Sequence, residues 1–125
     1  MQQQIQRLEI VSLAIATTSR AIVALREQLS IIEANHVLDI QSQTNEGGKP
    51  QYPNEDARQA ALTLRLADDE TYRQLTLRLR DTEFERARLN AEHDRLRQEF
   101  KLYVLDRQAE VMRASDGLPA GYPFK

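Results

Sequence analysis

Apolar residues recur every three or four positions over residues 3–38, a stretch that contains no Gly or Pro. This spacing predicts a helix with one apolar stripe, because every third or fourth residue of an α-helix lies on the same face. The positions of the stripe are Leu8, Val11, Ile15, Thr18, Ile22, Leu25, Leu29, Ile32 and His36.

The same spacing returns over residues 69–113 and predicts a second long helix. Its stripe consists of Tyr72, Leu75, Leu79, Thr82, Arg86, Leu89, His93, Leu96, Phe100 and Tyr103. Acidic and basic residues alternate along its flanks three or four positions apart, as in the pair Arg95 and Glu99. Such pairs stabilise a solvated helix surface, so these flanks are typical of a coiled coil.

Between the two helices, the segment 39–53 is polar and carries Gly47, Gly48, Pro50 and Pro53. These residues predict a loop. Asn54 then precedes two acidic residues, a pattern that predicts a helix N-cap and a short helix over 54–67.

The stretch ADDETYRQL offers a second helix start, with Asp68 or Asp69 as the cap, so we expect a break at 67–69. A break there leaves residues 69–113 to pair with residues 3–38 in matching register.

Together these elements predict an all-α fold, an antiparallel helical hairpin or coiled coil with a short intervening helix. We expect one domain over residues 1–114, followed by a C-terminal tail over 115–125. Tyr122 and Phe124 of the tail either dock onto the helices or belong to a frayed end.

Further apolar residues lie off the two stripes, where a single hairpin would leave them in water. They are Ile31, Leu77, Phe84, Ala87, Ala91 and Leu105. Because a face this wide exceeds the needs of a two-stranded seam, we expect self-association into a helical-bundle oligomer through these residues.

Composition narrows the choice of function. Of the 125 residues 29% are charged and 6% aromatic, with no Trp, which favours a long narrow seam over a compact core. The absence of Cys excludes a disulfide framework and thiol catalysis.

No run approaches the ~18 apolar residues of a membrane span, and the first residues lack the basic start of a secretory signal. We therefore expect a cytoplasmic protein without a membrane partner.

Arginines outnumber lysines 14 to 3, although the net charge is −2. One interpretation is a strip for single-stranded nucleic acid, with tyrosine as a stacking platform. Its residues would be Arg58, Arg65, Tyr72, Arg73, Arg78 and Arg80. The other interpretation is a solvated helix surface, since acids are interleaved with most of the arginines.

Candidate catalytic and metal-binding patterns are sparse. Glu33 and His36 have the Glu-x-x-His spacing of di-iron bundles, but His93 has no matching Glu, so both histidines are interpreted as seam residues that set register. Arg86, His93, Thr18 and Ser19 predict a polar layer in the seam, either a ligand cavity in an oligomer or a register pin. No phosphate loop or nucleophile motif is present, and we expect no enzymatic activity, cofactor or metal.

The segment GKPQYPNEDARQAALTLRLADDETYRQL resembles small uncharacterised coiled-coil proteins of bacteriophages and mobile elements. The resemblance covers roughly residues 45–105 and rests on the pattern GKPxYxNEExRxxAL followed by AxDxEYQxL. The matching residues are Gly48, Lys49, Pro50, Tyr52, Asn54, Glu55, Arg58, Ala61, Leu62, Asp69, Glu70, Tyr72, Gln74 and Leu75. The resemblance implies a gene context of phage DNA recombination and replication, and it implies no catalytic residue.

We therefore expect a non-enzymatic, oligomeric interaction or scaffold protein with a protein partner. The alternative is an accessory factor for recombination or replication that binds single-stranded DNA. A further alternative is a prefoldin-like holdase, whose coils would hold unfolded clients at their tips.

Overall fold

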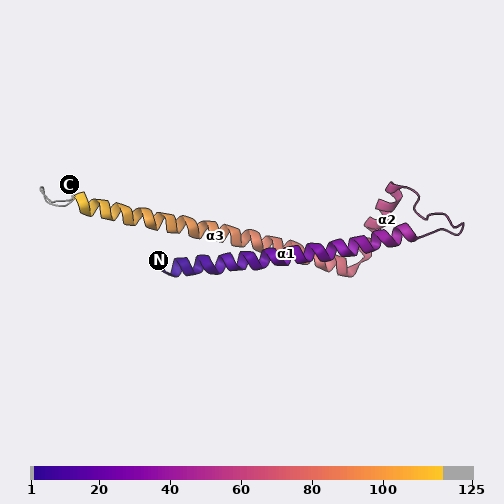
Figure 1. Cartoon of the computed structure of the whole chain (residues 1–125), viewed down its shortest axis with the longest axis horizontal. Coiled ribbons are helices and arrows are strands. Elements are labelled where there is room, and N and C mark those ends of the chain that lie inside the picture. Colours follow the sequence, from indigo (N-terminus) through magenta and orange to yellow (C-terminus); the bar gives the residue numbers. More distant parts are fainter. Residues whose placement is uncertain (1, 117–125) are drawn as a thin grey trace. The chain divides into compact units, whose positions relative to one another are not determined.

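The computed structural model describes residues 2–116, which form three α-helices labelled in Figure 1. Helix α1 spans Gln2–Ser42, α2 spans Glu55–Asp68 and α3 spans Glu70–Asp116. The described part of the chain contains no strand beyond one isolated bridge between Thr44 and Pro50. The prediction of an all-α fold is confirmed.

Helix α1 continues four residues beyond its predicted end, so the predicted loop 39–53 is wrong at its start. Residues 39–42 contain no helix breaker, and Ile40 is buried with 2% of its surface exposed. Val37 and Ile40 border the same small hollow as Leu62 of α2, so contact between these helices keeps the last turn of α1 folded.

The loop closes on itself through Asn45. Its side-chain oxygen accepts hydrogen bonds from the backbone N–H groups of Gly47 and Lys49, at 2.9 and 3.1 Å. Gly48 has a φ of 74°, a conformation that suits glycine because it has no Cβ. The loop therefore orders itself with local bonds and returns the chain to the start of α2.

Both predicted capping sites are present. The Asn54 side chain accepts a 2.8 Å hydrogen bond from the Ala57 N–H at the start of α2. Asp69 separates α2 from α3 with an extended backbone (ψ 105°), and its carboxylate accepts from the Tyr72 N–H at 3.0 Å. Asp69, rather than Asp68, is thus the cap of α3, and the predicted break at 67–69 is confirmed.

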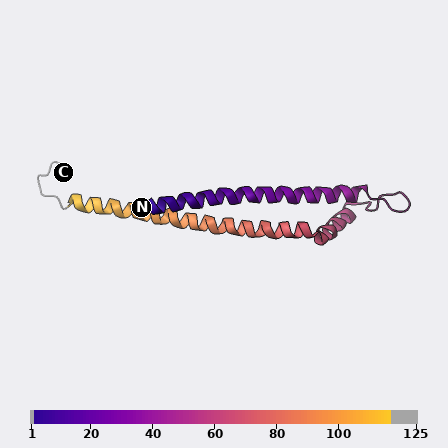
Figure 2. The ribbon, with the colours of Figure 1, turned by 90° about the horizontal axis from the view of Figure 1, so that it is seen from below.

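The chain divides into two compact units, the first formed by residues 1–15 and 88–125 and the second by residues 16–87. In the first unit, Val11 of α1 packs with Leu89 and Leu96 of α3 in a buried cluster. Arg7 donates two hydrogen bonds to Glu92, at 2.5 and 3.0 Å. In this unit α3 extends past the first residues of α1, as Figure 2 shows.

In the second unit, α1 and α3 again lie side by side and run in opposite directions. Arg26 pairs with Glu83 at 3.0 Å, whereas Glu33, later in α1, pairs with Tyr72, earlier in α3. The predicted stripe positions Ile22, Leu25 and Leu29 are buried here. Ala61 is the buried residue of α2.

The predicted single domain over residues 1–114 stays a prediction, because α1 and α3 each pass through both units. Residues 115 and 116, which were assigned to the predicted tail over 115–125, belong to α3. Tyr122 and Phe124 lie outside the described residues.

Replacing Asn54 with Ala should destabilise the protein by about 1 kcal/mol, because it removes the cap of α2. Urea unfolding followed by circular dichroism at 222 nm measures this loss. Asn54→Ser is the matched control, since a serine hydroxyl can accept the same N–H. Equal stability of the Ala and Ser variants would contradict the assigned cap.

Candidate functional site

The most connected polar cluster of the described residues lies in the second unit, where α1 passes the junction of α2 and α3. His36 Nε2 lies 2.8 Å from Asp69 Oδ2. One turn away, the Tyr72 hydroxyl donates a 2.6 Å hydrogen bond to Glu33 Oε1. Glu33 and His36 are three residues apart in α1 and therefore share one face of that helix. The cluster joins α1 to the residue that separates α2 from α3.

Each of these two hydrogen bonds shifts the pKa of one side chain, Asp69 in the first and Tyr72 in the second. The hydrogen bond from His36, followed by that from the Tyr72 backbone N–H, lowers the pKa of Asp69. The hydrogen bond to Glu33, reinforced by partial burial, raises the pKa of Tyr72 to about 12. Asp69 is thereby held as an anion, and the Tyr72 hydroxyl keeps its proton at neutral pH.

The polar side chains of this cluster are bonded to one another and connect the helices. Every polar side chain of the cluster already has a partner within the cluster. Over residues 2–116, no group of three His, Cys, Asp or Glu side chains is placed to hold a metal ion. The spacing of Glu33 and His36, which resembles half of a di-iron motif, here serves two separate hydrogen bonds.

Three of the five arginines predicted to contact nucleic acid are engaged by acids. Arg58 donates to Glu55 at 3.2 Å and to the Tyr52 carbonyl at 3.3 Å. Arg65 forms an ion pair with Asp39, and Arg73 forms one with Glu70. These contacts neutralise much of the positive charge that the predicted strip would offer to phosphates.

Arg78 and Arg80 differ from the other three. Both are exposed, and neither forms an ion pair within the described part of the chain. Arg78 and Arg80 are two residues apart. Because an α-helix turns about 100° per residue, their side chains lie on nearly opposite sides of α3. Tyr72, the predicted stacking platform, is half-buried and bonded to Glu33. The structure thus brings Tyr72 and Arg73 near the junction and does not gather all six residues in one strip.

The residues predicted to mediate self-association are all exposed. Phe84 has 74% of its surface accessible, Ile31 61% and Leu77 53%, all in the second unit. Ala87 is exposed in the same unit, and Ala91 and Leu105 are exposed in the first. The predicted self-association surface is therefore available on both units.

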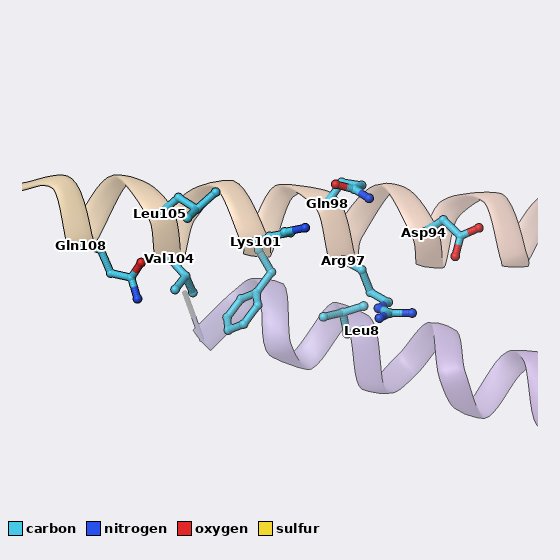
Figure 3. Close-up of a pocket in the computed structure, with 9 residues that line it drawn as sticks. Leu8, Asp94, Arg97, Gln98, Lys101, Val104, Leu105 and Gln108 are labelled. Carbon is cyan, nitrogen blue, oxygen red and sulfur yellow. The ribbon is translucent and has the colours of Figure 1, made fainter.

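An open groove runs along α3 in the first unit, close to Leu8 of α1 (Figure 3). Arg97 and Lys101 supply positive charge, and Val104 and Leu105 supply apolar surface. The lining holds one carboxylate, Asp94, and no histidine or hydroxyl side chain.

The prediction that no run approaches the length of a membrane span is wrong for α1, which is long and apolar enough to cross a membrane, judged by length and composition alone. Only 17% of its most apolar 18-residue window is buried within the chain. A helix that is apolar around most of its circumference needs cover on several sides, from protein or from lipid. The core helix of a protein passes the same test of length and composition.

Sequence reasoning missed the ion pairs between helices, above all Asp39 with Arg65 and His36 with Asp69. His36 lies 33 residues before Asp69 in the sequence. Whether the two side chains meet depends on how α2 folds against α1, which no local pattern specifies.

Comparison of the chain with protein-family models, curated proteins and solved structures finds no match.

Replacing Asp69 with Asn should make stability less sensitive to acid. The lowered pKa of Asp69 means that its ionised form stabilises the fold above about pH 4, and that this contribution disappears as pH falls through the folded-state pKa. Asn keeps an oxygen that can accept the Tyr72 N–H but carries no charge. Urea midpoints measured from pH 7 down to pH 2.5 should therefore fall less steeply for Asp69→Asn than for the wild type.

Asp69→Ala provides the comparison, because it removes both the charge and the cap. This variant should be less stable than Asp69→Asn at every pH. An acid dependence of Asp69→Asn identical to that of the wild type would show that the His36–Asp69 contact does not stabilise the fold.

Proposed function

We propose that this chain is a non-enzymatic scaffold whose helices pair as an antiparallel hairpin and assemble into a helical-bundle oligomer that holds a protein partner. The observation that carries the proposal is the exposed apolar surface on both units. Isolated exposed apolar residues are ordinary, but repeated ones on the same helices indicate interaction surfaces. Phe84 alone leaves 74% of its surface in water.

The geometry of the helices supports assembly. Along most of its length α1 packs against α3 alone, and α2 joins it only at its last turn. The buried residues Val11, Ile22 and Leu29 belong to the predicted stripe of α1. Two helices cannot enclose a core, because each contacts the other along a single line. Additional helices would cover the remaining apolar residues at little cost, since long helices satisfy their own backbone hydrogen bonds.

A cytoplasmic location without a membrane is part of the proposal. Helix α1 carries Arg20 inside its most apolar stretch, and Arg26 just after that stretch pairs with Glu83 of the strongly charged helix α3. Charges at the centre of a membrane span are costly. Protein helices with polar flanks cover such a surface better than lipid does.

The resemblance to phage and mobile-element proteins leads us to propose that origin for the chain.

A second candidate function is binding of single-stranded nucleic acid in recombination or replication. Arg78 and Arg80 support it, because both are exposed and free of ion pairs within the described residues. An oligomer would repeat these side chains many times, and several weak phosphate contacts acting together can give measurable affinity.

Size-exclusion chromatography with light scattering should show a discrete oligomer of the wild type. Replacing Leu77 and Phe84 together with Lys should dissociate it, because each buried apolar side chain contributes roughly 1.5–3 kcal/mol, or about 10- to 100-fold in affinity. Leu64→Lys is the matched control, since Leu64 of α2 is equally exposed, at 68%, but lies on another helix. A monomeric wild type would contradict the proposed function.

Replacing Arg78 and Arg80 with Glu tests the second candidate. If these arginines contact phosphates, the variant should lose at least 10-fold in affinity for a fluorescent single-stranded oligonucleotide at low salt, and the salt dependence should become shallower. Fluorescence anisotropy measures both quantities. The charge-matched control replaces Arg107 and Arg113 with Glu, both in the exposed end of α3. Equal loss in both variants would indicate a general charge effect.

A further inference from the structure

Each long helix of the second unit carries an exposed stripe turned away from the buried seam. In α1, Ala24 and Ile31 follow the buried residues Ile22 and Leu29 by two positions. In α3, Leu77 and Phe84 follow the seam positions Leu75 and Thr82 by two positions. Two positions correspond to about 200° around a helix, so both stripes face away from the helix partner in the same chain.

The stripes have matching spacing. The outer stripe of α1 consists of Ala21, Ala24, Gln28 and Ile31, and the outer stripe of α3 consists of Leu77, Arg80, Phe84 and Ala87. All eight residues are exposed, and both sets advance by three, four and three positions. This is the spacing of coiled-coil contact positions. The two stripes can therefore pack on each other along their full length.

We infer that the outer stripe of α1 in one copy packs antiparallel against the outer stripe of α3 in a second copy. This inference rests on the proposed oligomeric scaffold and specifies how its copies meet. The contact joins two different surfaces of the same chain, so it leaves one free stripe at each end of any open array.

The bulk of Phe84 favours one register of this contact. With Ile31 opposite Leu77, the bulky Phe84 lies opposite the small Ala24, and Ala21 lies opposite Ala87. In this register Phe84, the largest side chain of either stripe, faces a methyl group, and the aliphatic side chains Ile31 and Leu77 face each other. A shift by seven residues would place Phe84 opposite Ile31 instead, with Ala24 opposite Ala91.

The polar residues agree with the same register. Arg80 would lie opposite Gln28, whose side-chain oxygen can accept a hydrogen bond from a guanidinium. Glu27 is the neighbour of Gln28, and both Glu27 and Arg80 are exposed and without an ion pair within the described residues. The pairing brings an unused acid of one copy to an unused base of the next.

This register also places neighbouring copies of the second unit at the same height along the helix axis. In one chain, the pairs Glu33–Tyr72 and Arg26–Glu83 put Ile31 at the height of residues 74–78 of α3. Leu77 lies within that range, so a neighbour whose Leu77 meets Ile31 has no displacement along the helix axis. Repeated contacts without displacement can close into a ring where the rotation between neighbours divides a full turn, whereas a seven-residue shift at each contact would give a filament.

The chain has no cysteine, so single introduced cysteines report this contact cleanly. Ile31→Cys and Leu77→Cys proteins are mixed in denaturant, refolded together and oxidised. The inferred contact predicts a disulfide-linked dimer in the mixture and little or none in either protein alone. The double variant I31C/L77C should give a ladder that ends at the oligomer mass measured by light scattering.

The pair Ile31→Cys with Phe84→Cys is the register control, because it would cross-link only in the shifted arrangement. Cross-linking of Leu77→Cys with itself, or of the control pair in preference to the first, would overturn the inference. An oligomer by light scattering without cross-linking between positions 31 and 77 would overturn the inference alone. A monomer would overturn the proposed function as well.

Discussion

The structure depends on one constraint: two helices can shield each other along a single line only. Helix α1 is 41 residues long and packs one side against α3, where Ile22 and Val11 are almost completely buried. Its other sides still carry apolar residues such as Leu13, Ile31 and Leu38, which remain more than half exposed. Because helix stability in proteins comes mainly from packing of apolar faces, α1 is only partly stabilised by its own chain.

The junction at Asp69 determines where the pairing of α1 with α3 begins. Asp69 ends α2, caps α3 and accepts a bond from His36 of α1, so one carboxylate connects all three helices. The Tyr72–Glu33 bond one turn later repeats the connection. These directed bonds fix the axial position of α3 on α1 in this unit, which apolar contacts alone specify weakly. A defined height is what any regular contact between copies requires.

Much of the fold could be predicted because its signals are local. The breakers around Gly48, the cap Asn54 and the three-four spacing of the buried residues are visible in the sequence. The final turn of α1 was missed because Ile40 is kept helical by burial near α2, a contact that no neighbouring residue indicates. Within the candidate site, the arginine strip failed to form one surface for a similar reason. Arg65 pairs with Asp39, which is distant in sequence and was assigned to a loop.

Lipid could in principle cover the apolar sides of α1, but it could not cover α3. The outer stripe of α3 alternates Leu77 and Phe84 with Arg80, and charged residues flank it on both sides. Such a surface needs a partner that offers apolar contact at its centre and polar groups at its edge, as another helix does. The outer stripe of α1 offers uncharged contact positions beside Glu27. The two incomplete surfaces of one chain therefore suit each other, and a second copy is the partner that we propose for both.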